Sequence, residues 1–179
     1  MGLFVYVDNS NVWIEGCRLS AVAKGMAPNL FAAMNDDIVD MSWSYDFGRL
    51  YELACPPGEL IGRSALFGSR PPPNDSLWQR ARDEGFEVIT YERNASNREK
   101  KIDVDIAVTM TEDSFLYMKS ERDTVVLVAG DADYVPAVEK LQHRGFKVQC
   151  LFWGQASREL RELCDDFINL DSHLDYLAR

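Results

Sequence analysis

The sequence predicts an α/β protein with a doubly wound, mainly parallel sheet of about five to six strands flanked by helices. Two observations lead to this prediction. Short apolar, β-prone runs alternate with helix-like segments along the whole chain, which is the order of a parallel sheet with helical crossovers. The run at residues 124–129 is continuously apolar, as expected for a strand that helices cover on both faces.

The first part of the chain begins with a buried strand. Residues 3–7 form an apolar run that ends abruptly in a polar Asp-Asn-Ser-Asn sequence, which predicts a strand followed by a turn. Asn11 is the expected N-cap of a helix over 11–24. Residues 25–58 mix glycine, proline, methionine and a small acidic cluster, and they predict an irregular or partly helical insertion with a helix near 45–54.

The later elements follow from apolar runs separated by glycine and proline. Three consecutive prolines after the second strand force an extended loop. Gly85 and Gly145 each end a predicted helix, because glycine readily takes the backbone conformation that follows a helix. Strands are predicted at residues 60–67, 86–91, 146–152 and 167–170, and helices at 75–84, 102–118, 134–144, 157–164 and 172–177.

Composition is that of an ordinary globular protein and excludes several classes. The 179 residues suit a single domain over 1–179 with its insertion at about 25–58. No apolar run approaches the roughly 20 residues of a membrane span, and no signal peptide is recognisable, so we expect a cytoplasmic protein without membrane contact. Four scattered cysteines and two histidines predict neither a zinc site nor a disulfide framework. The net charge of −10 argues against a general nucleic-acid-coating surface but permits a local basic patch.

Acidic residues gather where predicted strands end. Asp8 follows the first strand, and Asp131 and Asp133 follow the strand at 124–129. A further pair, Asp103 and Asp105, opens the helix after the third strand. Ligands bind at the carboxyl ends of parallel strands near the point where strand order reverses, so we expect these carboxylates to converge.

Converging carboxylates repel one another unless a proton or a cation joins them. Mg²⁺ or Mn²⁺ fits such an oxygen site, and a bound ion would assist attack of water on a phosphodiester. Each aspartate taken alone could instead cap the following helix or complement its dipole. The coincidence of all three places favours the metal site.

A basic segment leads into the acidic helix. Residues 93–101 carry four basic side chains against one acidic one, and this segment is predicted to hold a nucleic-acid backbone; a solvated loop is the alternative. Arg63 and Arg70, expected near the end of the second strand, would extend this surface. The predicted substrate-binding residues are Asn11, Arg93, Arg98, Lys100 and Lys101.

Three stretches resemble the NYN domain, a branch of the PIN-like nuclease superfamily. The opening F-V-Y-V-D-N-S-N resembles the first strand of that family with its Asp-x-x-Asn signature. The stretch K-K-I-D-V-D-I-A resembles the lysine-rich entry to its acidic helix, and V-A-G-D-A-D-Y-V-P resembles its Ser-Gly-Asp-x-Asp-Phe segment. The resemblance covers roughly residues 2–170, apart from about 25–58.

The resemblance implies a PIN-like sheet and a metal-dependent ribonuclease, usually endonucleolytic, that acts on RNA. It assigns catalytic and metal-binding roles, with Mg²⁺ or Mn²⁺, to Asp8, Asp103, Asp131 and Asp133, and it makes Asn11 a support for Asp8.

Two features keep other functions open. Thr109 stands where many members of that family carry a further Asp, and together with the acidic composition it favours the alternative of a catalytically weak or inactive module that docks RNA or a protein partner. The insertion at 25–58 is a candidate surface for substrate selection, a homo-oligomer or a protein partner. A phosphatase or phosphoacceptor is a third alternative, although the segment after Asp8 lacks the Asp-x-Asp pattern of such enzymes.

Overall fold

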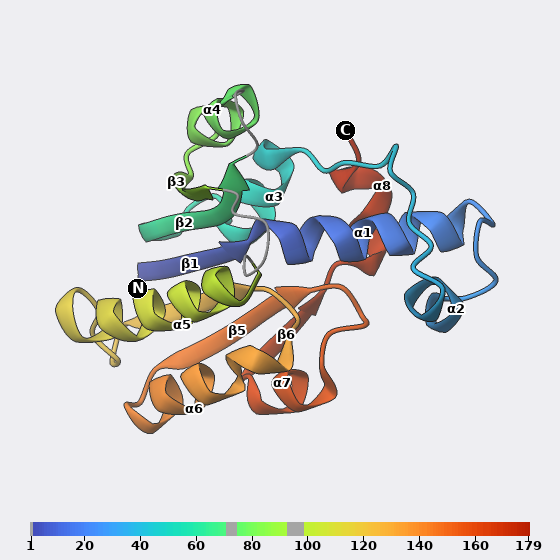
Figure 1. Ribbon diagram of the computed structural model, residues 1–179. Coiled ribbons are helices and arrows are strands. Elements are labelled where there is room, and N and C mark those ends of the chain that lie inside the picture. Colours follow the sequence, from blue (N-terminus) through green and yellow to red (C-terminus); the bar gives the residue numbers. More distant parts are fainter. Residues whose placement is uncertain (1, 71–74, 93–98) are drawn as a thin grey trace.

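A six-stranded parallel sheet forms the centre of the computed structural model, which describes residues 2–70, 75–92 and 99–179 (Figure 1). The strand order is β3-β2-β1-β4-β5-β6, so the chain winds outward from β1 to β3, returns to β4, and winds outward again. This order reverses between β1 and β4, and the doubly wound α/β fold is confirmed. The strands are β1 (Gly2–Asp8), β2 (Leu60–Arg70), β3 (Glu87–Glu92), β4 (Asp123–Val128), β5 (Lys147–Phe152) and β6 (Asp166–Asn169).

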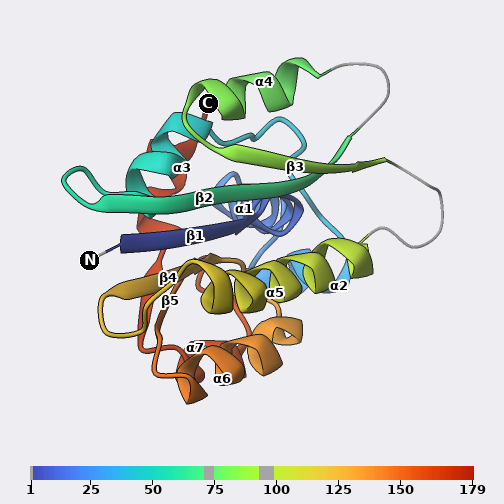
Figure 2. The same cartoon turned by 90° about the vertical axis from the view of Figure 1, so that its left-hand side faces the viewer.

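Helices cover both faces of the sheet (Figures 1 and 2). On one face α1 packs on β1 and β2 and contacts α8, while on the other face α5, α6 and α7 lie side by side. The α-helices are α1 (Asn9–Ala23), α2 (Leu30–Asn35), α3 (Phe47–Ala54), α4 (Ser76–Asp83), α5 (Glu99–Leu116), α6 (Val135–His143), α7 (Arg158–Leu163) and α8 (Leu174–Leu177). Two short 3-10 helices, η1 (Ala132–Tyr134) and η2 (Asp171–His173), precede α6 and α8.

Burial explains the central strands. Every residue of β1 and of β4 is buried. The continuous apolar run at residues 124–129 predicted this burial for β4, as a strand that is covered on both faces. Gly85 and Gly145, with φ of +110° and +84°, lead from α4 and α6 into the next strands, which is a conformation that other residues adopt only with strain. These two predicted helix ends are confirmed.

The structure corrects three predicted boundaries. The N-cap of α1 is Asp8 rather than Asn11, because the Asp8 carboxylate accepts a hydrogen bond from the Asn11 main-chain N–H. Strand β2 continues three residues beyond the prediction, since Gly68, Ser69 and Arg70 pair with β3. Helix α5 begins at Glu99, inside the segment predicted to be a loop.

The insertion wraps around α1 instead of forming a separate unit. Trp43 packs edge-to-face on Trp153 at a centroid distance of 5.8 Å, and both rings lie over Gly16. A Cβ at Gly16 would come within 2.3 Å of the Trp43 ring, so this close approach requires glycine. None of the helices in the described ranges is long and apolar enough to cross a membrane.

Candidate functional site

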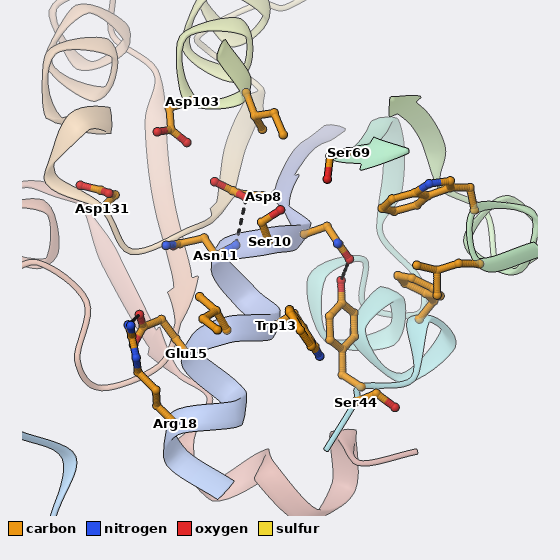
Figure 3. Close-up of a pocket in the computed structure, with 17 residues that line it drawn as sticks. Asp8, Ser10, Asn11, Trp13, Glu15, Arg18, Ser44, Ser69, Asp103 and Asp131 are labelled. Carbon is orange, nitrogen blue, oxygen red and sulfur yellow. Dashed lines mark hydrogen bonds and ion pairs between the residues drawn. The ribbon is translucent and has the colours of Figure 1, made fainter. Parts of the chain in front are cut away.

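Four of the five predicted acidic residues meet at the carboxyl edge of the sheet, where the strand order reverses. Asp8 ends β1, Asp131 and Asp133 follow β4, and Asp103 lies in the first turns of α5. One carboxylate oxygen from each of Asp103, Asp131 and Asp133 lies within 4.8 Å of the other two. Figure 3 shows Asp8, Asp103 and Asp131 grouped at one end of a pocket.

Asp8 is the most buried of the four aspartates, with 4 % of its surface exposed. Its Oδ1 accepts the Asn11 N–H at 3.1 Å, and its Oδ2 accepts the Tyr134 hydroxyl at 2.9 Å. Burial raises the pKa of the Asp8 carboxyl, and these hydrogen bonds oppose part of that rise. Asp8 therefore lies behind the group of three, in contact with it through Tyr134 and Asp103.

Asp103 holds a proton more tightly than an ordinary carboxyl group does. Its pKa is raised to about 7, first by burial and then by the neighbouring charges of Asp8 and Asp131. The same surroundings raise the pKa of Tyr134, through burial first and then through Asp8 and Asp103. A site that resists the loss of its protons in this way would be stabilised by a cation.

A hydrogen bond from the main chain to a side chain holds the two strand ends together. The Asn11 side-chain oxygen accepts the Gly130 N–H at 2.9 Å, which joins the start of α1 to the turn after β4. A Cβ at Gly130 would come within 2.1 Å of the Phe152 ring, so only glycine allows the turn to pass this close to β5. The Asp131 carboxylate accepts the Asp133 N–H at 3.2 Å and caps η1. Asp131 thus performs the capping role as well as contributing to the acidic group.

A pocket of about 660 Å³ extends from the acidic group along α1 (Figure 3). The insertion supplies one wall, where the Tyr45 hydroxyl donates to Asn9 Oδ1 at 2.6 Å. The half-buried Trp13 indole donates to the Trp43 carbonyl at 3.3 Å and lines the same wall. Arg18 also lines the pocket, but ion pairs with Glu15 and Asp37 already engage its guanidinium.

Other sequence predictions have different outcomes. Asp105 does not join the acidic group among the described residues; its carboxylate lies beside Tyr91 and contributes, after burial, to raising the pKa of Tyr91 to about 12. Residues two apart on a helix point roughly 200° apart, so Asp103 and Asp105 could not both face the site. Arg63 lies early in β2 and is paired with Asp113 and Glu87, so the prediction that it extends an RNA surface is wrong.

The predicted basic segment is only partly within the described residues. Arg93 and Arg98 lie outside them. The main chain of Lys100 and Lys101 belongs to the first turn of α5, three and two residues before Asp103 respectively. Their role in binding a substrate stays a prediction.

Sequence reasoning missed Tyr134, Tyr45 and Trp13 as parts of the site. Tyr134 follows Asp133 at the position where the similar family segment has Phe, so the extra hydroxyl was visible in the sequence. Tyr45 belongs to the insertion, and no local pattern indicated that it would reach Asn9.

The donor set fits a hard divalent cation. The group consists of carboxylate oxygens, which Mg²⁺ and Mn²⁺ prefer. Among the side chains that the structure describes, in residues 2–69, 75–91 and 102–179, no ion pair links a basic side chain to Asp8, Asp103, Asp131 or Asp133. Fold and site together define a parallel α/β protein with an acidic centre at its topological switch point.

Comparison with known proteins gives the family. The family model of the NYN domain matches residues 9–171, and the chain belongs to this family, which generally contains nucleases that use divalent metals. Four chains of known structure match. One is a protein of unknown function from Vibrio parahaemolyticus, 18 % identical, with a TM-score of 0.70 over 99 % of this chain and 96 % of that one. It shares the fold, and no curated protein matches.

Proposed function

We propose that this protein is a Mg²⁺- or Mn²⁺-dependent ribonuclease that hydrolyses RNA phosphodiester bonds. The observation that carries the proposal is the convergence of Asp103, Asp131 and Asp133 at the switch point, with one oxygen of each within 4.8 Å of the others. Membership of the NYN family supports the choice of nuclease chemistry over other uses of an acidic site.

The three converging carboxylates would hold the ion, and the ion when bound would polarise the phosphoryl group and lower the pKa of a water molecule. Asp8 is buried behind them and would fix the arrangement through its contacts with Tyr134 and Asn11. Asn11 would also keep the Asp131 turn in place through its bond to Gly130.

The substrate would reach the carboxylates through the pocket along α1. Trp13 presents a half-buried indole there, on which a base could stack, and stacking of this kind tolerates any base. The phosphates would be held by the basic segment with Arg93, Arg98, Lys100 and Lys101, which leads directly into Asp103. A path of this kind suits a single strand.

The test is cleavage of an end-labelled, mixed-sequence RNA with Mn²⁺, with Mg²⁺ or with EDTA. Asp103→Asn and Asp131→Asn each keep the shape of the side chain and remove its charge. Because a bound ion contributes several kcal/mol to the transition state, we expect each variant to lose about 100-fold or more in rate.

Glu139→Gln is the matched control, because Glu139 is an exposed carboxylate on α6, six residues after Asp133 in the chain. We expect this variant to cleave like the unmodified protein. Cleavage that persists in EDTA, or that is equal in all variants, would count against the proposal.

An inactive docking module is the second candidate. Val104, Val108 and Phe115 are more than half exposed along α5 and line an apolar groove that starts at Asp103 and Asp133. A protein that binds RNA or a partner protein without cutting RNA in any metal would favour this function.

A further inference from the structure

A buried hydroxyl joins the three chain segments that carry the acidic site. The Tyr134 side chain has no exposed surface, and its hydroxyl oxygen lies 2.9 Å from Asp8 Oδ2 and 3.2 Å from Asp103 Oδ1. Tyr134 also ends η1, the short helix that Asp131 caps and that contains Asp133. One side chain thus connects the end of β1, the first turns of α5 and the segment after β4.

We propose that Tyr134 is a positioning residue of the metal site. Its hydroxyl fixes Asp8 and Asp103 relative to Asp131 and Asp133, so that the carboxylates are arranged for a divalent cation before it binds. This inference rests on the proposed function in one respect, since it takes these carboxylates to be the ones that hold a metal.

A tyrosine hydroxyl is chemically suited to this place because it donates a hydrogen bond without adding charge. Carboxylates this close together repel, and a single hydroxyl proton that lies between their oxygens reduces this repulsion. A lysine or arginine would do the same but would compete electrostatically with the cation. The ring is held by the core, so the position of the hydroxyl is set by the packing around it.

The hydroxyl can be removed without removing the ring. Tyr134→Phe keeps the aromatic ring that packs in the core and takes away only the oxygen atom. Partners that orient metal ligands in this way change metal affinity by about 10- to 100-fold when they are removed. The oxygen atom of Tyr134 should accordingly affect metal binding more than folding.

The competing explanation is that Tyr134 merely satisfies a buried hydroxyl. Tyr6 provides the matched control, because it is equally buried and its hydroxyl donates to Asp113 Oδ2 at 2.6 Å. Asp113 lies on the same helix as Asp103 but ten residues further on, roughly 15 Å along the axis. Tyr6→Phe therefore removes the same kind of buried bond away from the site.

The experiment compares Mn²⁺ binding by calorimetry in the unmodified protein, Tyr134→Phe and Tyr6→Phe. Unfolding in EDTA is measured in parallel, and sucrose is present in every sample so that a destabilised variant stays folded. We expect the Mn²⁺ Kd to rise about 10- to 100-fold in Tyr134→Phe. In Tyr6→Phe we expect a loss of stability with an unchanged Kd.

The outcomes separate this inference from the proposed function. Equal Mn²⁺ affinity in Tyr134→Phe and in an unmodified protein that cleaves RNA would overturn only the role of Tyr134. Unfolding of Tyr134→Phe where Tyr6→Phe stays folded would overturn it too, because the hydroxyl would then be structural. Weakened Mn²⁺ binding in a protein that cuts no RNA would support the role of Tyr134 and remove the nuclease. An unmodified protein that binds no Mn²⁺ would remove both.

Discussion

Helix α5 carries two buried tyrosine–carboxylate contacts, one at each end, and they differ in one respect. Near its start, the Tyr134 hydroxyl lies within hydrogen-bond distance of both Asp8 and Asp103. Near its end, Tyr6 donates to Asp113. The second carboxylate also receives the Arg63 guanidinium at 2.6 Å, whereas no basic group among the side chains described in 2–69, 75–91 and 102–179 is paired with the first group.

This difference distinguishes the structural ion pair at Asp113 from the acidic group around Asp103. Asp113 has both a hydrogen-bond donor and a cation, so its buried charge is compensated inside the protein. Asp103 and Asp8 have the donor but no cation among the side chains that the structure describes, and the pKa of each carboxyl is raised. A buried acid whose counter-charge lies within the protein, as that of Asp113 does, is therefore no evidence of a metal site.

The strongest test of this difference removes Arg63, the cation that is paired with Asp113. Arg63→Met leaves the Asp113 carboxylate, which is 4 % exposed, without its counter-charge. Removing one partner of a buried pair typically costs about 3–5 kcal/mol, and we expect about 3 because Arg63 is partly exposed. Urea unfolding in EDTA measures this loss. A loss below about 1 kcal/mol would mean that solvent rather than Arg63 compensates Asp113.

A smaller effect on the free energy of unfolding is expected at Asp103, near the start of α5. The pKa of Asp103 is raised from 3.8 to about 7 in the folded protein, so the folded state binds the proton more tightly than the unfolded state. The stability that this proton supplies is complete below the lower value and is lost as the pH rises to the higher one. Asp103→Asn cannot titrate and should avoid this loss. Above about pH 7 in EDTA we expect the variant to be more stable by on the order of 1 kcal/mol, after allowance for solvent screening of the half-buried group.

The measurement is the free energy of unfolding between about pH 4 and about pH 8, with EDTA and then with Mn²⁺. Mn²⁺ should stabilise the unmodified protein and should do little for Asp103→Asn, because ligand binding stabilises only the state that binds. A variant whose stability falls with pH as steeply as that of the unmodified protein would place the raised pKa on another group.

Local sequence patterns were sufficient to predict the sheet and its helices. Apolar runs such as residues 124–129 and helix-ending glycines such as Gly145 depend on neighbouring residues only, and the structure confirms them. The insertion was not predictable in this way. Its position depends on Trp43 meeting Gly16 and Trp153, contacts between residues far apart in the chain.

The acidic site also has some features that follow from local sequence and others that depend on contacts between distant residues. Its aspartates could be located because each follows a strand or opens a helix, which is a local property. The ion pair of Arg63 could not be predicted, because its partner Asp113 lies 50 residues away on a different element. The contact of Tyr134 with Asp8 joins residues 126 positions apart, and no local pattern predicted it.

The smallest expected effect tests whether burial, and not the number of bonds, distinguishes the two carboxylates around Arg63. Glu87 accepts two hydrogen bonds from Arg63, both of 2.8 Å, but its side chain is 53 % exposed. Water and salt screen such a pair, so Glu87→Gln should cost about 0.5 kcal/mol in urea unfolding, and less at high salt. The Arg63→Met variant should cost several times more, because the buried Asp113 then loses its cation. Equal losses in the two variants would show that Glu87 is the principal partner of Arg63. Asp113 would then be a buried acid without a strong counter-charge, as Asp103 is among the described side chains, and the ion pair with Arg63 would not distinguish the two.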